Sequence, residues 1–563
     1  MFPRGRLWLL YGGLAVWALV VWLRLAQVQL IDHADWAQLA SEQQEKTVEI
    51  QQPRGEILTR DGRVLAGSLE RVRIGANPRR IPRSAWPSLA RELAPLVGLS
   101  ETEILARFRA ASNFLYVARD LDPSVAAAIK RLGHDHLWIE PTERRVYPHG
   151  PLAGATIGFV NGEGAGQAGL EAQFESTLRG APGTFRLVRD GSRKGTQVEL
   201  RPERPGRPGL TLRLALDSRV QVILEQELDR TIGEIGARGA TAVAMDPWTG
   251  QVLGLASLPS YDPGRPGEVS GEVRRNRAIE DALEPGSTFK PFIFAAALAH
   301  GVLRPHELVD CSGGGVQVAG FLIRDHASYG LLSATQALAV SSNSGAIRIA
   351  HRLSPALLDA SIRSLGFGSA TGIELPAEAR GIYRSPERWS AMSRAGLAIG
   401  QEISASALQI ARGYAALANG GVLVRPSLVL ETLDPRDRNV ITPYRQSPGT
   451  RALPPEVARQ VAAMLGAVVD EGTGKAARVE GYRAAGKTGT AQKAGVGGYT
   501  AGLHAAWFAG FLPRENPKLV VVVCVDQPER TYWAADVAAP TFGRIVTRLV
   551  TALGLPPVTG VRT

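Results

Sequence analysis

An uncharged, strongly apolar segment near the N-terminus precedes a long remainder in which apolar and polar positions mix in short patterns. Residues 7–23 consist mainly of Leu, Val, Trp and Ala, and at about 1.5 Å per residue they extend about 26 Å, near the short end for a transmembrane helix. Arg4 and Arg6 precede this segment, so the positive-inside rule places Met1 in the cytoplasm and the rest outside. A cleaved signal peptide is the alternative, but no small-x-small cleavage pattern follows. We therefore predict an uncleaved, single-pass signal anchor at residues 1–31.

The pattern from residue 32 to about residue 209 is mixed and rich in loops. It predicts short strands at residues 48–50 and 57–58, and amphipathic helices at residues 85–97 and 101–109. We expect a mixed, elongated N-terminal module over residues 32–209, because a cluster of residues that break helices and strands follows it. The cluster comprises Pro202, Pro205, Gly206, Pro208 and Gly209.

Strands, helices, further strands and a last helix follow one another from residue 210 onward. This order indicates one large α+β domain, residues 210–563, whose antiparallel sheet is completed by a C-terminal hairpin. The predicted strands cover residues 210–216, 241–245, 251–256, 505–512 and 519–526, and the predicted helices cover residues 218–235, 288–300, 333–352, 355–365, 405–419 and 538–553.

The composition and charge exclude several classes of protein. The 563 residues are 45% hydrophobic and 21% charged, which is typical of a chain that buries sizeable cores. The formal net charge is +11, but there is no Lys/Arg run with the aromatic spacing of a nucleic-acid groove. We therefore expect no nucleic-acid partner. A basic surface also fits anionic lipid headgroups or an acidic cell-wall polymer.

The remaining polar motifs point to neither a metal nor a cofactor. Two cysteines, Cys311 and Cys524, are too few for a disulfide framework or a Cys-based metal site, and the apolar run around Cys524 predicts a packed thiol. The sequence His134-Asp135-His136 could bind a metal, but no clear third ligand accompanies it, so a solvated loop is the better interpretation. We expect no metal and no cofactor.

The strongest chemical signal is the sequence Glu-Pro-Gly-Ser-Thr-Phe-Lys at residues 284–290. If Ser287 opens a helix, Lys290 lies one turn later on the same face. A serine hydroxyl needs a base to become a nucleophile, and a buried amine with a lowered pKa can serve. An S-x-x-K pattern alone is more often a helix cap followed by a surface lysine.

Two further motifs follow the S-x-x-K pattern along the chain, and together with it they favour a catalytic serine over a helix cap. Ser341-Ser342-Asn343 is an S-x-N element inside an otherwise apolar helical stretch, where polar side chains are unexpected unless they face a cleft. Lys487-Thr488-Gly489-Thr490 is a K-T-G element on a predicted strand, where Gly489 would let a substrate backbone approach. The three elements together are the signature of serine β-lactamases and penicillin-binding proteins.

The chain resembles the class B penicillin-binding proteins over its whole length, and the forms of its S-x-x-K and S-x-N elements are most similar to the division-specific FtsI branch. The resemblance implies a transpeptidase domain at residues 210–563 behind a pedestal or dimerisation-type module at residues 32–209. The motifs that carry it, besides the three above, lie at residues 54–62, 144–148, 169–171, 276–278, 371–373, 418–421 and 472–474.

The resemblance also implies roles for the site residues. Ser287 would attack a peptidoglycan stem pentapeptide with loss of D-Ala, Lys290 would accept the proton, and Ser341 with Lys487 would return it to the leaving amine. Asn343 would hold the substrate amide. Thr488 and Thr490 would bind its terminal carboxylate, and the backbone N–H groups of Ser287 and Thr490 would form the oxyanion hole.

Alternatives and partners remain open at this point. A D,D-carboxypeptidase or a β-lactamase would use the same chemistry, and a β-lactam sensor or a scaffold would use the same fold. An elongation-type transpeptidase is the alternative to a septal one. The resemblance implies β-lactams as covalent inhibitors, and the cytoplasmic membrane as the place of the anchor. It also implies a glycan polymerase of the FtsW/RodA (SEDS) type and divisome proteins as partners.

Overall fold

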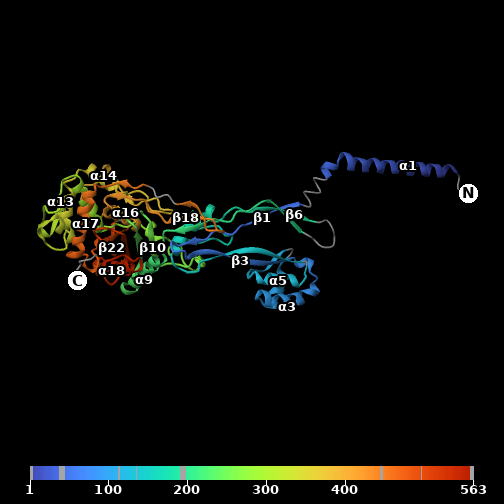
Figure 1. Ribbon diagram of the computed structural model, residues 1–563, viewed down its shortest axis with the longest axis horizontal. Coiled ribbons are helices and arrows are strands. Elements are labelled where there is room, and N and C mark those ends of the chain that lie inside the picture. Colours follow the sequence, from blue (N-terminus) through green and yellow to red (C-terminus); the bar gives the residue numbers. More distant parts are fainter. Residues whose placement is uncertain are drawn as a thin grey trace. The chain divides into compact units, whose positions relative to one another are not determined.

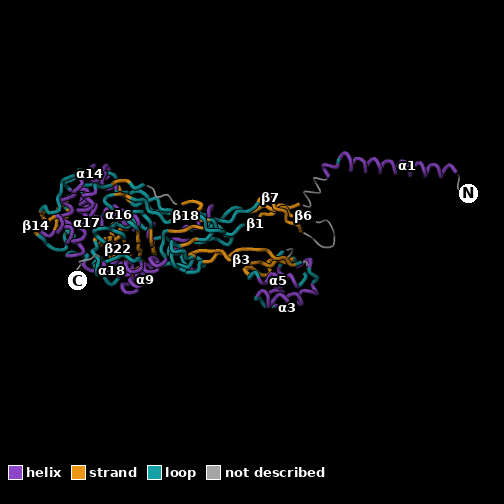
Figure 2. The backbone as a smooth tube through the Cα atoms, in the orientation of Figure 1, coloured by secondary structure: helices purple, strands orange, loops and turns teal. Residues whose placement is uncertain are grey.

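The chain folds into two compact units. One unit comprises residues 1–54 and 179–209, and the other comprises residues 55–178 and 210–563. The N-terminal module expected over residues 32–209 is thus divided between the units, because residues 55–178 group with residues 210–563. Figures 1 and 2 show the computed structural model, which describes residues 4–36, 45–111, 114–134, 136–189, 198–443, 448–495 and 498–557.

The first unit contains the N-terminal helix α1 (Arg4–Ala26), which continues into the π-helical turn Gln27–Ile31. Within the described residues, Leu7–Ile31 is the one helix long and apolar enough to cross a membrane, and its most apolar part is not buried against other residues. The unit also contains an antiparallel sheet in the order β1-β6-β7. Its strands are β1 (Glu45–Ile50), β6 (Gly183–Arg189) and β7 (Val198–Arg204).

In the second unit, a mixed sheet joins residues 55–178 to residues beyond 210. Its order is β19-β18-β8-β2-β3-β4, with β5 also pairing with β3, and β2 runs parallel to β8. Asp61 reinforces this junction, because its carboxylate accepts hydrogen bonds from the backbone N–H (3.1 Å) and the hydroxyl (2.7 Å) of Ser218, at the start of helix α9 (Ser218–Ile235). The strands are β2 (Ile57–Leu58), β3 (Val64–Ala76), β4 (Leu115–Leu121), β5 (Leu137–Val146), β8 (Thr211–Leu214), β18 (Val429–Leu433) and β19 (Val440–Pro443).

Two of the N-terminal motifs meet in a buried ion pair. Arg145 Nε lies 2.7 Å from Glu171 Oε1, and both side chains are almost completely buried. Arg145 also donates a hydrogen bond to the carbonyl of Gly55, at 2.8 Å. Further hydrogen bonds help a buried ion pair to offset the cost of desolvation, and the Gly55 carbonyl supplies one of them. These motif residues therefore hold the module together rather than contribute to a cleft.

The outer ends of β3, β4 and β5 carry a small separate core. Ile74 of β3 packs with Leu89, Phe108 and Ile129 from three helices. Helix α4 begins with a capping box, in which the Ser100 hydroxyl accepts from Glu103 N and the Glu103 carboxylate accepts from Ser100 N. Both predicted helices in this region are confirmed. The three helices are α3 (Trp86–Val97), α4 (Glu101–Ala110) and α5 (Ser124–Arg131).

The central sheet of the second unit is antiparallel throughout, in the order β10-β9-β23-β22-β21. Alternate residues point to opposite faces. Val243 and Val522 join a core that includes α16, whereas Ala242 and Val521 join a core that includes α9 and α18 (Figure 1). The predicted completion of the sheet by the C-terminal hairpin is confirmed. The elements are α9 (Ser218–Ile235), β9 (Ala237–Met245), β10 (Val252–Leu258), α16 (Ala407–Ala418), β21 (Ala485–Gly495), β22 (Gly498–Leu512), β23 (Leu519–Pro528) and α18 (Ala538–Ala552).

The prediction of one helix over residues 333–352 is wrong. The segment forms two helices, α12 (Ala334–Ala339) and α13 (Asn343–Ala350), separated by a break at which Ser341 has a φ of 64°. The apolar positions continue across the break, so periodicity alone does not reveal it. The S-x-N element therefore lies in a tight turn between helices. The other helices of this region are α10 (Arg277–Glu280), α11 (Lys290–Ala299), α14 (Pro355–Ser364), α15 (Ser393–Ala398) and α17 (Pro455–Asp470).

Candidate active site

Ser287 lies in a 3₁₀ turn, Gly286–Phe289, which leads directly into helix α11. The predicted helix start at this point is thus a tighter turn than an α-helix, and the Ser287 side chain remains half-buried. Two contacts hold the turn. Gly286 N donates to the carbonyl of Gly400 at 3.1 Å, and the Tyr414 hydroxyl donates to the carbonyl of Thr288 at 2.9 Å.

Glycines allow two other segments to approach this turn closely. A Cβ at Gly489, on β21, would lie 2.5 Å from the carbonyl oxygen of Pro285, and a Cβ at Gly400 would lie 2.0 Å from that of Gly286. Real Cβ atoms do not come this close to a backbone oxygen. Gly489 is expected from the sequence to admit a substrate backbone, and its close neighbour in the structure is the turn that carries Ser287.

Lys290 is completely buried, and its amine contacts the S-x-N element. Nζ donates hydrogen bonds to Ser341 O (2.5 Å), Asn343 Oδ1 (2.7 Å) and Ser341 Oγ (3.3 Å). Burial lowers the pKa of Lys290 to about 7, although the nearby Asp325 and Cys311 act in the opposite direction. A substantial fraction of this amine is therefore neutral near pH 7, as a general base requires.

The left-handed turn at Ser341 makes these contacts possible. A φ of 64° costs a non-glycine residue about 1 kcal/mol, and such strain persists where the surrounding structure enforces it. The turn directs both the carbonyl and the hydroxyl of Ser341 to Lys290. The S-x-x-K and S-x-N elements, 51 residues apart at Lys290 and Ser341, are therefore in direct contact.

Lys487, on β21, is the second completely buried amine of the site. Burial, and then the positive charge of Lys290, lower the pKa of Lys487 well below its usual range. Its Nζ lies 3.3 Å from the hydroxyl of Thr488, which in turn lies 2.7 Å from the hydroxyl of Thr473. Gly489 of the K-T-G element packs against the backbone of the turn that carries Ser287, so the K-T-G element lies beside the S-x-x-K element.

The hydroxyl of Thr490, farther along β21, has a different partner. It accepts a hydrogen bond from Ala534 N at 3.0 Å and thereby attaches the segment before α18 to the strand. The three predicted elements thus come together from distant parts of the chain. Asp325 and Thr473 also contact them, although the sequence interpretation assigns neither residue a role. Thr473 belongs to a motif that the resemblance identifies, whereas no local pattern distinguishes Asp325.

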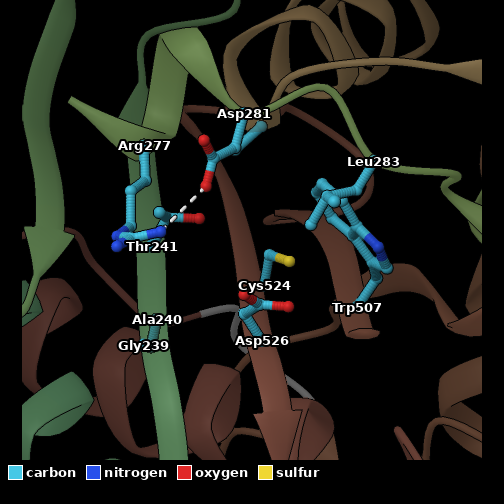
Figure 3. A pocket seen from close by; sticks show the side chains of 10 residues that line it. Gly239, Ala240, Thr241, Arg277, Asp281, Leu283, Trp507, Cys524 and Asp526 are labelled. Atoms are coloured by element: carbon cyan, nitrogen blue, oxygen red, sulfur yellow. Dashed lines mark hydrogen bonds and ion pairs between the residues drawn. The ribbon is translucent and has the colours of Figure 1, made fainter. Parts of the chain in front are cut away.

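The pocket drawn in Figure 3 is separate from these residues. It lies at the sheet and is lined by side chains that include Thr241, Trp507 and Cys524, with the ion pair of Arg277 and Asp281 (3.2 Å) at its edge (Figure 3). None of the predicted catalytic residues lines it. Burial raises the pKa of the Cys524 thiol well above its usual range, so this cysteine stays protonated and packed, in agreement with the prediction.

The described residues contain no group of three or more His, Cys, Asp and Glu side chains that could hold a metal ion. Asp135 of the His134–His136 motif lies outside these residues. His134 Nε2 lies 3.3 Å from a carboxylate oxygen of Glu92. The predicted motifs supply two completely buried amines, Lys290 and Lys487, and the half-buried Ser287.

Comparisons with known proteins agree with this chemistry. The family described as penicillin binding protein transpeptidase domain matches residues 240–547, and the penicillin-binding protein dimerisation domain matches residues 49–214. Peptidoglycan D,D-transpeptidase FtsI of Escherichia coli (strain K12) is 33% identical over 550 residues, which cover 95% of this chain and 91% of the relative. Stage V sporulation protein D of Bacillus subtilis (strain 168) is 32% identical over 558 residues, which cover 98% of this chain and 86% of the relative.

A solved structure is similar over nearly the same length. Penicillin-binding protein 3 from Mycobacterium tuberculosis, complexed with aztreonam, superposes with a TM-score of 0.71 at 27% identity, and the match covers 91% of this chain and 98% of that one. The α+β fold with an N-terminal module, predicted from the sequence, is confirmed. The resemblance drawn from the motifs is confirmed as well: this chain belongs to the class B penicillin-binding proteins and is a serine-type transpeptidase.

Proposed function

We propose that this transpeptidase cross-links peptidoglycan stem peptides through an acyl-enzyme on Ser287. The observation that carries the proposal is the buried Lys290 amine, one turn after Ser287 and hydrogen-bonded to Ser341 and Asn343. Relatives named peptidoglycan D,D-transpeptidase, such as FtsI of E. coli, supply the class of substrate.

Acylation begins when Ser287 Oγ bonds to the carbonyl carbon of the penultimate D-Ala and its proton passes to Lys290. The oxyanion is stabilised by the backbone N–H groups of Ser287 and Thr490. Preorganised donors of this kind contribute about 3–4 kcal/mol each to transition-state stabilisation. When the C–N bond breaks, the leaving D-Ala amine receives a proton through Ser341, with Lys487 nearby as a second buried amine.

Transfer completes the cycle. An amine from a neighbouring stem attacks the ester carbonyl, its proton passes to the neutral Lys290, and Ser287 Oγ regains a proton as the new amide forms. Asn343 holds the substrate amide, and Thr488 and Thr490 bind the terminal carboxylate. Gly489 lets β21 pack directly against the nucleophile turn, which brings Thr488 and Thr490 close to Ser287.

The place of the protein in the cell follows from the anchor. We place residues 1–31 in the cytoplasmic membrane, residues 32–209 as a pedestal and residues 210–563 as the catalytic domain, both outside it. The apolar helix Leu7–Ile31 behind Arg4 and Arg6 supports this orientation. Fusion of a reporter active only outside the cytoplasm to the C-terminus tests it, and an inactive reporter would refute it.

The cellular role is septal cross-linking together with a glycan polymerase of the SEDS type. The forms of residues 284–290 and 341–343, most similar to the FtsI branch, support this role. A fluorescent fusion is expected to concentrate at the division site, and uniform labelling of the side wall would instead favour elongation. Penicillin-binding protein 3 from M. tuberculosis forms complexes with aztreonam and with ampicillin, which supports β-lactams as covalent inhibitors here.

Product analysis tests the proposed reaction. The full-length protein in detergent is incubated with a stem pentapeptide ending in D-Ala-D-Ala and a second stem that offers an amine. We expect release of D-Ala together with a cross-linked dimer, measured by mass spectrometry. Release of D-Ala with only a tetrapeptide product would identify a carboxypeptidase, and no release would refute the assignment.

The Gly400→Ala variant tests how the nucleophile turn is held. Its Cβ would collide with the Gly286 carbonyl, and we expect acylation by a fluorescent penicillin to fall about a hundredfold, because small displacements of a reacting group have effects of this size. Gly420→Ala is the matched control, since Gly420 has a similar φ of 80° but no atom within 4 Å of its Cβ. Equal acylation rates in the two variants would show that the contact is unimportant.

A further inference from the structure

Asp325 directs its carboxylate at the S-x-N turn from a separate part of the chain. It follows strand β13 (Phe321–Arg324), which pairs with β12 (Gly315–Val318). Its oxygens accept hydrogen bonds from the Ser342 hydroxyl (3.0 Å), from Asn343 N and from Ser344 N (3.1 Å). One carboxylate thus binds three consecutive residues of another element.

These hydrogen bonds satisfy the start of helix α13. The first N–H groups of a helix have no partner within the helix, and a negative charge is favourable there. Ser342 provides only one local cap, because its hydroxyl accepts from Gly345 N at 3.0 Å. Asp325 accepts from the N–H groups of Asn343 and Ser344, so the helix can begin at Asn343, two residues after the left-handed Ser341.

The residue before Asp325 orients the catalytic amide. The carbonyl of Arg324 accepts a hydrogen bond from Asn343 Nδ2 at 2.8 Å. The amide oxygen of Asn343 therefore faces Lys290 Nζ, at 2.7 Å. Arg324 and Asp325 together determine how the S-x-N element meets the amine.

We propose that Asp325 is a positioning residue for acylation, which holds the Ser341–Asn343 turn, and through it the Lys290 amine, in the productive arrangement. The proposal rests on the proposed function, in which Lys290 takes the proton from Ser287. It predicts two separable effects of Asp325, one through geometry and one through charge.

The charge effect follows from the groups around Lys290. The negative charge of Asp325 favours the ammonium form and opposes the lowering of the Lys290 pKa by burial. Cys311 stays protonated because burial raises its pKa, and Lys487 contributes positive charge when protonated. Three further groups lie nearby. Arg348 lowers and Asp310 raises the pKa of Cys311. Burial and then Asp325 raise the pKa of Tyr329, so Tyr329 is uncharged.

The experiment compares acylation rates of Asp325→Asn, Asp325→Glu and the parent with a fluorescent penicillin over a range of pH. In Asp325→Asn we expect the maximal rate to fall about tenfold to a hundredfold, because the amide cannot accept from all three donors. Loss of the negative charge lowers the Lys290 pKa, so neutral amine persists to lower pH. The acid limb of the rate profile is therefore expected to shift to lower pH.

Asp325→Glu separates charge from geometry. It retains the negative charge but displaces it, so we expect a reduced maximal rate with an acid limb close to that of the parent. Asp310→Asn, in strand β11 (Leu308–Cys311), is the matched control, and we expect a parent-like profile from it. Thermal unfolding verifies that each variant is folded before its rates are compared.

Each outcome is decisive. A parent-like rate and profile for Asp325→Asn would overturn the proposal. A lower rate with an unmoved acid limb would also overturn it, because a merely structural residue produces that result. If the parent itself forms no adduct on Ser287, the proposed function fails. If the parent reacts and Asp325→Asn does not differ from it, only this inference fails.

Discussion

We expect the Ser287→Ala variant to form no covalent adduct with a fluorescent penicillin, whereas the parent is labelled. The substitution removes one oxygen atom from a half-buried side chain, so the turn Gly286–Phe289 and the contacts of Gly286 and Thr288 are retained. Without Oγ no ester can form, and removal of a nucleophile typically lowers the rate by about a millionfold. Gel fluorescence and intact mass spectrometry measure the adduct.

The control is Ser369→Ala, at an exposed serine of the same domain. It is expected to label like the parent, and both variants should unfold at nearly the parent temperature. Persistent labelling of Ser287→Ala would contradict the assignment. The labelled peptide would then identify the true nucleophile, for which Ser341 is the first candidate, because its hydroxyl also contacts Lys290.

The second large effect is expected from Lys290→Met, which keeps a chain of similar length but removes the amine. We expect acylation to slow about 10²–10⁴-fold, the usual contribution of a general base. The pKa of about 7 adds a pH signature, since the neutral amine is the base and predominates above this value. The parent rate should therefore rise with pH through about 7 and then level off, whereas the variant should lack this limb.

Two comparisons make the result specific. Lys475→Met, at an exposed lysine of the short helix Lys475–Ala477, is expected to behave as the parent does. Lys487→Met identifies which buried amine acts as the base. If Lys487→Met loses the acid limb while Lys290→Met keeps it, the roles of the two lysines are exchanged. A parent rate that does not vary with pH would exclude both.

Much of the fold could be predicted because the relevant information is local. The helix Ser218–Ile235 agrees with the prediction at both ends, since Asp217 caps its start and Gly236, in the left-handed region, follows its end. The last strands, β22 and β23, are apolar runs long enough to identify as buried strands. Local spacing also places Lys290 one turn after Ser287.

The helix at residues 333–352 could not be predicted correctly, for a physical reason. Its apolar positions favour a continuous helix, and nothing local prevents Ser341 from adopting helical angles. The break is stabilised from elsewhere, by Lys290 at the Ser341 carbonyl and by Asp325 at the N–H groups of Asn343 and Ser344. These partners are distant in sequence, so the periodicity contains no sign of them.

The sequence by itself determined the apolar N-terminal helix, the order of strands and helices, the three motifs and, through them, the family. All of these depend on residue types at short spacings. The tertiary structure decided the left-handed turn at Ser341, the complete burial of Lys290 and Lys487 with their lowered pKa values, and the hydrogen bonds of Asp325. Desolvation and charge act through space, so only folding brings these residues close enough for one to change the chemistry of another.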